Sequence, residues 1–281
     1  MASVNVYYAA GNFRSKLIAQ AMTRGIRMVC NDKAKLLPST YYRGVDSDIA
    51  VFYGLAEGLH RVFQEYSKYA KAVYVDLGYW HRRINTKYDG YHKVVVNGRH
   101  PTPYFQQVSH PKDRFQEMHI DIKPWRKGGS HVLIAGMSGK AAAAEGLIPE
   151  YWERNAVAQI KKLTERTVVY RPKPNYSNCH HIQGAVMQRN VELQNALINC
   201  HAVATHHSNV AVDAILAGVP AFCVEGVASP MSCDDLSKIE EPWMPDNRIQ
   251  WASDIAYCQW SMVEIQNGLP WKHLKKEGLI P

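Results

Sequence analysis

The feature that most constrains the fold is a pattern that the chain begins twice: an apolar run, a glycine turn and an amphipathic stretch. The first copy is 4–10 (VNVYYAA), broken at Gly11-Asn12 and followed by helical spacing of apolar residues over 13–27. The second is 131–140, where HVLIA leads into a glycine turn and small residues. Strands separated by helix-length segments favour a parallel sheet that is covered on both faces.

The same alternation continues between and after these two copies. In the first half we predict strands over 47–54, 71–80 and 92–102 and a helix over 57–70. In the second half we predict helices over 150–164, 190–199 and 209–217 and strands over 167–174, 201–207 and 219–225. The polar stretch 106–130 is expected to link two domains, and 249–268 to form one long amphipathic helix.

The fold class predicted from this pattern is α/β, with two Rossmann-like doubly wound domains facing across a cleft. We expect a first domain over 1–125, a second over 126–248, and a C-terminal segment, 249–281, whose helix packs across both. A hydrophobic content of 46% in 281 residues is sufficient for two such cores.

Targeting signals and cysteine pairs are not evident in the sequence. No run approaches the roughly 20 apolar residues of a membrane span, and the N-terminus does not have the pattern of a secretory signal. The six cysteines form no CxxC pair and are interpreted as buried free thiols. These features predict a soluble cytoplasmic monomer, in the host cytoplasm if the source is viral.

Charge is divided unevenly along the chain. Residues 1–125 carry 18 Lys and Arg against 10 Asp and Glu, whereas residues 126–281 carry 15 of each. The whole net charge of +8 therefore lies in the first half. A basic domain beside a neutral one suggests a polyanionic partner, most often nucleic acid, although a solvated basic surface is the alternative.

The segment 205–222 (THHSNVAVDAILAGVPAF) carries the strongest chemical signal. A strand ends before Ser208 and Asn209, which can cap the next helix, and the free N–H groups at such a helix start suit a diphosphate. Asp213 follows about one turn later, within reach of ribose hydroxyls. An ordinary capped αβ unit with a solvated Asp213 is the alternative interpretation.

The pattern Ser-Asn-x-x-x-Asp-Ala-x-x-x-Gly-x-Pro resembles the nucleotide-sugar-binding half of GT-B glycosyltransferases and the related UDP-sugar 2-epimerases. This resemblance implies that Ser208 and Asn209, preceded by His207, contact the diphosphate and that Asp213 holds the ribose. The acid is Asp here, where Glu is commoner in the family. The chain would then use a UDP-sugar as co-substrate and require no cofactor.

Two further segments agree with a donor site. The loop residues Gly136, Met137, Ser138 and Gly139 open the second domain, at the place where GT-B enzymes approach the phosphates or the sugar. The run YRPKP puts Arg171 and Lys173 at the carboxyl end of a strand, where their charges would neutralise a leaving UDP without a metal. A surface turn stiffened by prolines is the alternative for the second segment.

Candidates for the acceptor side lie in the first half. Asp76, at the end of the strand 71–80, is the leading general base, with His100 as its rival and a structural turn-capping role as the alternative. Cations would hold phosphates while aromatic rings stack on bases. The residues assigned to this contact are Gly11, Asn12, Arg14, Tyr79, Trp80, Arg82, Arg83 and Arg99, together with Lys87, Tyr88, Lys93 and Tyr104.

The size, the two-domain plan and the basic acceptor half resemble the phage DNA glucosyltransferases. The resemblance implies glucose transfer from UDP-glucose to a 5-hydroxymethylpyrimidine in DNA, such as 5-hydroxymethylcytosine, after the base leaves the helix. Three alternatives remain open: a GT-B enzyme with a glycan or lipid acceptor, a UDP-sugar 2-epimerase, and a non-catalytic nucleic-acid-binding protein on a GT-B frame.

Metal binding is not expected from the spacing of histidines and cysteines. Cys179-His180-His181 and His206-His207 form no zinc-finger or HExxH pattern. Neighbouring side chains on a strand point to opposite faces, so that a His-His pair within a strand rarely reaches one ion.

Overall fold

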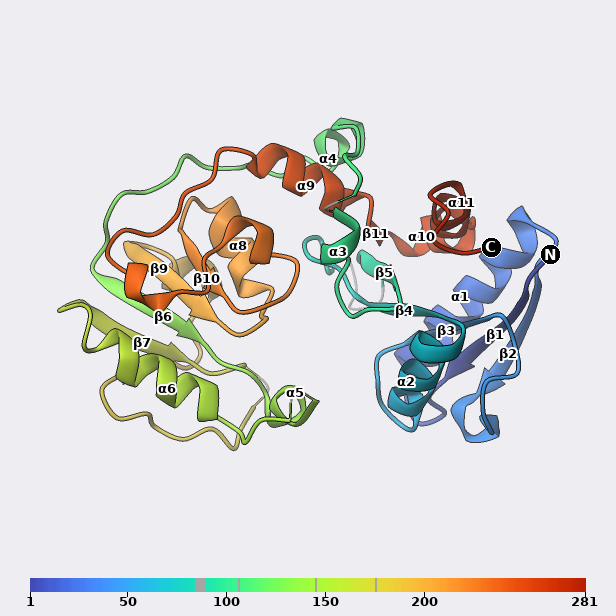
Figure 1. Ribbon diagram of the computed structural model, residues 1–281, viewed down its shortest axis with the longest axis horizontal. Coiled ribbons are helices and arrows are strands. Elements are labelled where there is room, and N and C mark those ends of the chain that lie inside the picture. The colour runs from blue at the N-terminus through green and yellow to red at the C-terminus, as the bar shows by residue number, and fades with distance from the viewer. Residues whose placement is uncertain (84–88, 106, 145, 175) are drawn as a thin grey trace. The chain divides into compact units, whose positions relative to one another are not determined.

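The computed structural model describes residues 1–83, 89–105, 107–144, 146–174 and 176–281. The chain forms two compact units (Figure 1). Unit 1 contains residues 1–104 and 254–281, and unit 2 contains residues 105–253. This division differs from the boundaries expected at residues 125 and 249. Among the described residues, no helix combines the length and the apolar character needed to cross a bilayer.

Unit 2 contains a five-stranded sheet in which every neighbouring pair is parallel. Its order is β10 (Ala221–Cys223), β9 (Cys200–Thr205), β6 (His131–Ala135), β7 (Thr167–Arg171) and β8 (Val186–Met187). The connecting helices are α5 (Gly139–Ala144), α6 (Tyr151–Ile160), α7 (Leu193–Ala196) and α8 (Val210–Leu216). The strand order reverses between β6 and β9, which is the arrangement of a doubly wound α/β fold. The predicted strands and helices of this half are confirmed, with shorter bounds.

The core of unit 2 lies on both faces of this sheet. Val132 and Ile134 of β6 pack into one cluster with residues of α6, such as Val157. Leu133 and Ala135 point to the other face and pack with residues of α7 and α8. Because successive strand residues alternate between faces, a run that is apolar throughout requires cover on both sides.

Unit 1 contains a six-stranded mixed sheet. Its order is β11 (Gln259–Trp260), β5 (His92–Val96), β4 (Lys71–Leu77), β3 (Ile49–Tyr53), β1 (Ser3–Tyr8) and β2 (Lys33–Pro38). The strands β1 to β4 pair in parallel, with α1 (Phe13–Val29) and α2 (Leu59–Tyr69) between them. The short helix α3 (Thr102–Phe105) follows β5. The edge strand β2 had no counterpart in the sequence prediction.

The expectation that 92–102 continues a parallel sheet is wrong, because β5 runs antiparallel to β4. The two strands approach each other through backbone hydrogen bonds from Gly78 N to the Tyr91 carbonyl, at 2.8 Å, and from Tyr91 N to the His81 carbonyl, at 2.9 Å. A side chain at Gly78 would lie 2.8 Å from the Tyr91 carbonyl oxygen. β4 and β5 therefore pair as an antiparallel hairpin.

The C-terminal segment forms several short elements instead of one helix over 249–268. These are α9 (Arg248–Ala256), β11, α10 (Met262–Gln266) and α11 (Leu269–Lys276). Gln259 and Trp260 leave the helix because they pair with β5. Ser261 then starts α10 with a capping box in which Glu264 takes part.

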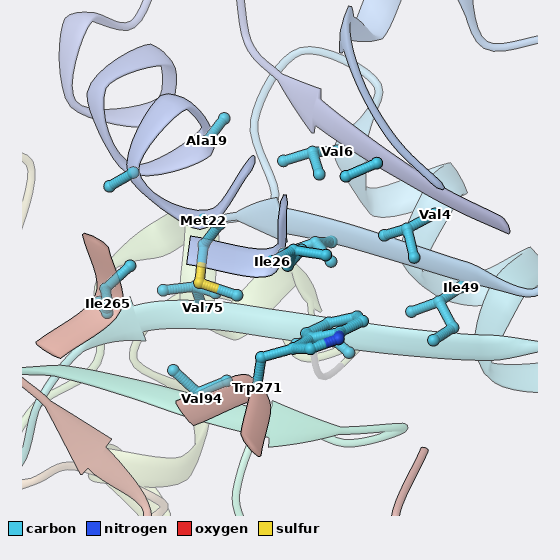
Figure 2. Close-up of a cluster of buried hydrophobic side chains, with 14 of the residues drawn as sticks. Val4, Val6, Ala19, Met22, Ile26, Ile49, Val75, Val94, Ile265 and Trp271 are labelled. Atoms are coloured by element: carbon cyan, nitrogen blue, oxygen red, sulfur yellow. The ribbon is translucent and has the colours of Figure 1, made fainter. Parts of the chain in front are cut away.

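This C-terminal segment completes the core of unit 1. In Figure 2, Met22 and Ile26 of α1, Val75 of β4, and Ile265 and Trp271 from the C-terminal helices meet over the sheet. Asp32 fixes the segment in place, since its carboxylate accepts hydrogen bonds from Trp271 Nε1 at 3.0 Å and from Ala2 N at 2.8 Å. Lys275 Nζ lies 2.8 Å from the same carboxylate. Residues far apart in the sequence therefore share one core.

The described part of the stretch 106–130, from residue 107 on, is not a free linker, because it packs within unit 2. After the short helix α4 (Asp113–Glu117), Lys123 N donates to the Leu216 carbonyl at 2.8 Å and Arg126 N to the Gly218 carbonyl at 2.7 Å. Gly218 has a φ of +76°, and an added Cβ would lie 2.0 Å from the Pro124 carbonyl oxygen. Only glycine permits both the turn and this close approach.

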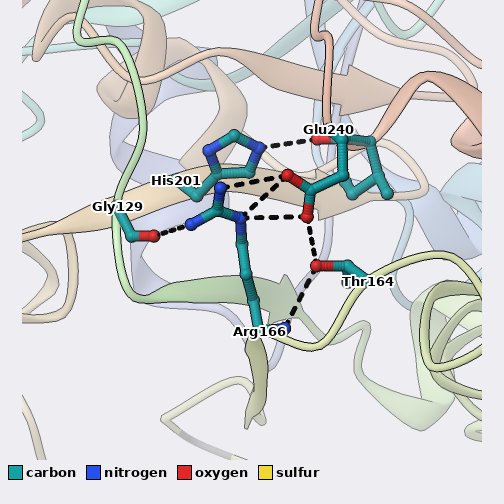
Figure 3. A network of polar contacts seen from close by, with 6 residues as sticks. Gly129, Thr164, Arg166, His201 and Glu240 are labelled. Atoms are coloured by element: carbon teal, nitrogen blue, oxygen red, sulfur yellow. Dashed lines mark hydrogen bonds and ion pairs between the residues drawn. The ribbon is translucent and has the colours of Figure 1, made fainter.

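A polar network also fastens this stretch to unit 2 (Figure 3). Arg166 forms three hydrogen bonds with the carboxylate of Glu240, at 3.0, 3.1 and 3.3 Å, and donates to the Gly129 carbonyl. Thr164 Oγ1 donates to the same carboxylate, and His201 Nε2 bonds the Ile239 carbonyl at 2.7 Å.

Candidate functional site

The carboxyl edge of the unit 2 sheet brings two predicted segments together. Ala135 and Thr205 are register partners at the ends of β6 and β9, and Thr205 Oγ1 donates to the Ala135 carbonyl at 2.9 Å. Ser208 N in turn donates to Thr205 Oγ1 at 3.3 Å. The loops 136–139 and 206–209 therefore start side by side at the point where the strand order reverses. We call them, together with Arg171 and Lys173, the unit 2 edge. Open α/β sheets bind ligands at such a position.

Contacts with β7 and α6 hold the loop 136–139 in place. Gly136 N donates to the Arg171 carbonyl at 3.0 Å, and a side chain at Gly136 would lie 2.8 Å from the Tyr170 ring. Met137 is buried, and its N–H donates to Glu153 Oε1 at 2.6 Å. Burial raises the pKa of Glu153, while the bond from Met137 opposes that rise. The N–H groups of Gly136 and Met137 are therefore already used within the protein.

The remaining residues of the unit 2 edge are more accessible. Ser138 Oγ accepts from Ala141 N at 3.3 Å at the start of α5. Arg171 is half-buried, with Nη2 donating to the Val191 carbonyl at 3.1 Å, and Lys173 is exposed. Two cations thus lie beside the loop 136–139, as the sequence predicted from their place after a strand.

The start of α8 has the predicted residues in a partly different role. Ser208 Oγ accepts from Val210 N at 3.3 Å. Asn209 occupies the N-cap position without a capping hydrogen bond from its side chain. Asp213 lies half-buried in the first turn, and its N–H donates to the Asn209 carbonyl at 3.2 Å. Because α8 has only seven residues, its dipole is a smaller contribution to anion binding than the sequence suggested.

The pair His206-His207 follows β9 instead of lying within it. The two imidazoles therefore do not point to opposite faces, and their Nδ1 atoms lie 3.0 Å apart. Glu225, which follows the neighbouring strand β10, places Oε1 at 4.0 Å from His206 Nδ1 and 3.9 Å from His207 Nδ1. The argument that excluded a shared ligand for this pair is consequently wrong in its geometry.

In unit 1, Asp76 lies at the carboxyl end of β4. Its Oδ2 accepts from the Tyr74 hydroxyl at 2.6 Å and its Oδ1 from Leu77 N at 2.8 Å. The carboxylate is half-buried. Two bound donors hold it in one orientation, which a positioned general base requires.

A buried lysine lies across the hairpin from Asp76. Lys93 of β5 is its register partner and is only 5% exposed, with Nζ donating to the Arg99 carbonyl at 2.8 Å. The pKa of Lys93 is lowered to about 8, chiefly by burial; the charge of Asp76 opposes this shift, and the charges of Arg99 and Arg82 add to it. The structure thus gathers Asp76, Lys93, Arg82 and Arg99, which we call the Asp76 cluster.

Arg14 reaches the same cluster from α1. Its Nη1 donates to the Tyr53 hydroxyl at 3.2 Å. Burial lowers the pKa of His92 to about 4, with Arg14 lowering it and Asp76 raising it. Burial, and then the charge of Asp76, raise the pKa of Tyr53 and of Tyr74. Several titratable groups therefore interact with Asp76.

His100, the rival base, has a different environment. It is half-buried, with Nδ1 3.5 Å from the Tyr79 hydroxyl. It also lines a mainly apolar pocket of about 260 Å³ within unit 1, together with Pro101, Tyr104 and Cys258. Asp76 does not line that pocket.

Two of the expected stacking residues, Tyr79 and Trp80, are not available for that role. Tyr79 is wholly buried and Trp80 is 5% exposed, so neither presents a ring face to a nucleic-acid base. Arg82 stabilises the turn after β4, because its side chain donates to the carbonyls of Gly78 and Tyr79 at 3.1 and 2.6 Å. Arg83 is exposed. The predicted contacts Lys87 and Tyr88 lie outside the described residues.

The turn after β1 is built from its own predicted residues. Gly11 N donates to Glu57 Oε2 at 3.1 Å, and Asn12 caps α1 by accepting from Ser15 N at 3.1 Å. The bonds observed for Gly11 and Asn12 thus shape the turn. Arg14, the second residue of α1, is the member of this group that reaches the Asp76 cluster.

Sequence reasoning missed three acidic or basic groups. Lys93 was assigned only a phosphate contact, because its position opposite Asp76 depends on the unexpected antiparallel pairing. Glu153 lies on a helix with no motif to mark it. Glu225 could have been found, since β9 and β10 were both predicted and the carboxyl ends of neighbouring parallel strands lie at one edge.

Comparisons with known proteins establish the fold. No protein family that was searched matches the sequence, and no curated protein matches it. Two solved structures of KpsC from Thermosulfurimonas dismutans resemble nearly the whole chain. The beta Kdo 2,4 transferase has a TM-score of 0.54 at 11% identity, covering 95% of this chain and 98% of its own. The beta Kdo 2,7 transferase has a TM-score of 0.53 at 10% identity, covering 96% and 99%.

A UDP-GlcNAc 2-epimerase from Methanocaldococcus jannaschii, in complex with UDP-GlcNAc and UDP, matches with a TM-score of only 0.35 at 10% identity, covering 90% of this chain and 98% of its own. A likeness of that strength carries no argument here. The two KpsC structures, together with the sheet order of each unit, show that this chain has the GT-B fold.

Proposed function

We propose that this protein is a glycosyltransferase that moves a sugar from a nucleotide-sugar to an acceptor hydroxyl. The observation that carries the proposal is the unit 2 edge, where the loops after β6 and β9 meet at the reversal of strand order. A fold alone does not define a function, so the proposal depends on the residues found there.

Unit 2 is assigned the donor. Arg171 and Lys173 would balance the charge that develops on the leaving diphosphate, and Ser208 would contact it beside the loop 136–139. Asp213 would accept hydrogen bonds from the ribose hydroxyls. The half-buried to exposed positions of these side chains support this assignment, because a ligand can reach them.

Unit 1 is assigned the acceptor and the general base. Asp76 would take the proton of the attacking hydroxyl as that oxygen bonds to the anomeric carbon and the bond to the diphosphate breaks. Its two hydrogen bonds hold the carboxylate in position. His100 is the second candidate for this role.

The acceptor is proposed to be polyanionic. Residues 1–104 and 254–281 carry 18 Lys and Arg against 10 Asp and Glu, whereas residues 105–253 carry 15 of each. The excess therefore belongs entirely to unit 1, as the sequence division had suggested. DNA containing a 5-hydroxymethylpyrimidine supplies both the anionic backbone and a reactive hydroxyl, although the buried Tyr79 and Trp80 no longer support base stacking.

A second candidate acceptor is a glycan. The resemblance to two beta Kdo transferases over at least 95% of this chain favours it. In this alternative the cations of unit 1 would bind an anionic saccharide, and Asp76 would act on a sugar hydroxyl in the same way.

The first test is calorimetric titration with UDP, UDP-glucose, UDP-GlcNAc, GDP and CDP-sugars, repeated on Asp213→Ala and on Glu165→Ala as an exposed control. We expect one nucleotide class to bind, with binding lost in Asp213→Ala and kept in the control. The bound donor is then incubated with hydroxymethylated DNA and, separately, with anionic oligosaccharides, and products are detected by mass spectrometry. Absence of binding by every nucleotide would refute the transferase proposal.

A further inference from the structure

We propose that His206, His207 and Glu225 form a binding site for one divalent cation of the zinc class. The three side chains come from adjacent parallel strands: the histidines follow β9 and the glutamate follows β10. The proposal concerns metal binding by these residues and does not rest on the transfer reaction.

The donor atoms are spaced as ligands of one ion. The two Nδ1 atoms lie 3.0 Å apart, and Glu225 Oε1 lies 4.0 and 3.9 Å from them. A point equidistant from all three atoms would therefore lie about 2.1 Å from each. Zinc binds imidazole nitrogen at about 2.0–2.1 Å and carboxylate oxygen at about 2.0–2.2 Å. One ion fits between the atoms where they stand.

The short separation of the nitrogens requires an atom between them. Two imidazoles that turned bare lone pairs toward each other at 3.0 Å would repel, so either the N–H of one neutral ring or a bound cation must lie between them. The carboxylate of Glu225 lies within 4.0 Å of both nitrogens. A hydrogen bond links the two nitrogens alone, whereas one metal ion bonds the two nitrogens and the carboxylate oxygen together.

The surrounding backbone holds the ligands in place. Glu225 N donates to the His206 carbonyl at 2.9 Å, which ties the two strand ends together. The Trp152 ring contacts the His206 ring edge-on, with centroids 6.0 Å apart. Gly226 follows with a φ of +105°, so the chain turns immediately after the glutamate. Supported ligands of this kind lose less entropy when a metal binds.

The neighbouring cysteine is not a fourth ligand in this arrangement. The thiol of Cys223 donates to the Glu225 carbonyl at 2.7 Å and so points to the backbone. Two imidazoles and one carboxylate remain, a set that suits zinc and similar transition metals and not magnesium or calcium. The histidine side chains are 12% and 18% exposed and that of Glu225 is 43% exposed, which leaves a path for the ion and for a further ligand.

The test uses the full chain, freed of metal with a chelator and then dialysed. Zn²⁺ is titrated calorimetrically, and Co²⁺ is added as a spectroscopic probe whose visible absorption reports coordination. We expect one tight equivalent of Zn²⁺ and a Co²⁺ spectrum of low coordination number. In His206→Gln and Glu225→Gln the affinity should fall at least about 10-fold. The matched control is His181→Gln, which removes an exposed histidine from the other His-His pair.

Circular dichroism of the metal-free variants checks that they are folded. Glu225→Gln changes a partly exposed position, so the test remains valid if His206→Gln does not fold. Quenching of tryptophan fluorescence by Co²⁺ gives a second readout, which should weaken in Trp152→Phe. The proposal is overturned if the wild-type chain binds no tight equivalent, or if Glu225→Gln binds Zn²⁺ as the wild type does.

Discussion

The carboxyl edges of the two sheets differ in how far their charged side chains are buried. In unit 1, Lys93 and His92 are buried, and burial lowers their pKa values to about 8 and about 4. In unit 2, Lys173 is exposed and Arg171 half-buried, and the loop beside them consists of small residues and Met137. The unit 1 edge therefore buries its titratable groups, whereas the unit 2 edge leaves its cations accessible to a ligand.

The two units also differ in how the chain closes them. Unit 2 is one continuous segment, fastened by the half-exposed Arg166–Glu240 pair, whereas unit 1 needs residues 254–281 to return to its N-terminal strands. The returning segment is held by Asp32, which pairs with Lys275 and whose side chain is only 2% exposed. Distant closure through a buried carboxylate should be more sensitive to mutation than local closure at the surface.

The largest expected effect is a loss of turnover when Asp76, at the unit 1 edge, is changed. Asp76→Asn should lower turnover by about 10²–10⁴-fold, because the attacking hydroxyl loses its base, while the donor affinity is unchanged. Turnover is measured by mass spectrometry and donor affinity by calorimetry. His100→Gln is the comparison, and equal activity of the two variants would contradict the assignment of Asp76.

The next effect concerns closure. Asp32→Ala should reduce the free energy of unfolding by about 3 kcal/mol, since Lys275, Trp271 Nε1 and Ala2 N lose a buried partner. Glu240→Ala in unit 2 should cost only about 1 kcal/mol, because that pair is largely solvated. Denaturant unfolding gives the totals, and hydrogen exchange of peptides from 254–281 and 105–253 locates the loss. Similar losses of unfolding free energy in the two variants would mean that the two units do not differ in their sensitivity to such mutations.

A smaller effect tests the buried charge of unit 1 through pH. The pKa of Lys93 is lowered on folding, so between pH 8 and its unfolded value the unfolded chain binds more protons, and stability rises with pH. Relative to Lys93→Met, the wild type should gain about 2 kcal/mol between pH 8 and 9.5. The difference between the two curves cancels the buried tyrosines and cysteines, which titrate in both proteins.

Lys162→Met, at an exposed position in unit 2, is the control for this measurement. Its stability curve should run parallel to that of the wild type. Parallel curves for Lys93→Met as well would mean that Lys93 keeps its ordinary pKa in the folded protein.

The smallest expected effect belongs to the unit 2 edge. Arg171→Gln should weaken nucleotide binding by about 10-fold, because one charge-assisted contact is lost while Lys173 remains. Titration calorimetry measures it, with Lys162→Gln as the control. An unchanged dissociation constant would mean that Arg171 does not bind the nucleotide and only donates to the Val191 carbonyl. The proposed diphosphate contacts would then be Lys173 and Ser208.

The difference between the units also explains which structural predictions succeeded. Unit 2 was predicted almost element by element, because each of its longer strands is an apolar run followed by a helix that crosses over to the next parallel strand. Unit 1 was predicted as far as β4 except for β2, whose lysines alternate with apolar residues at the sheet edge. Beyond β4 the hairpin and the strand β11 depend on pairing between distant segments, which no local periodicity reports.

The candidate site divides along the same line. The sequence by itself determined which residues lie at or just beyond strand ends: Asp76, the loop 136–139, Arg171 and the run from His206 to Asp213. It could do so because alternation and helical spacing are properties of neighbouring residues. Tertiary structure alone decided that Lys93 faces Asp76 and that Tyr79 and Trp80 are buried. The sequence could place Glu225 at the same edge as the two histidines, but only the tertiary structure set the distances between them. Register and burial depend on which distant strand pairs with which, and the free energy of that choice belongs to the whole core.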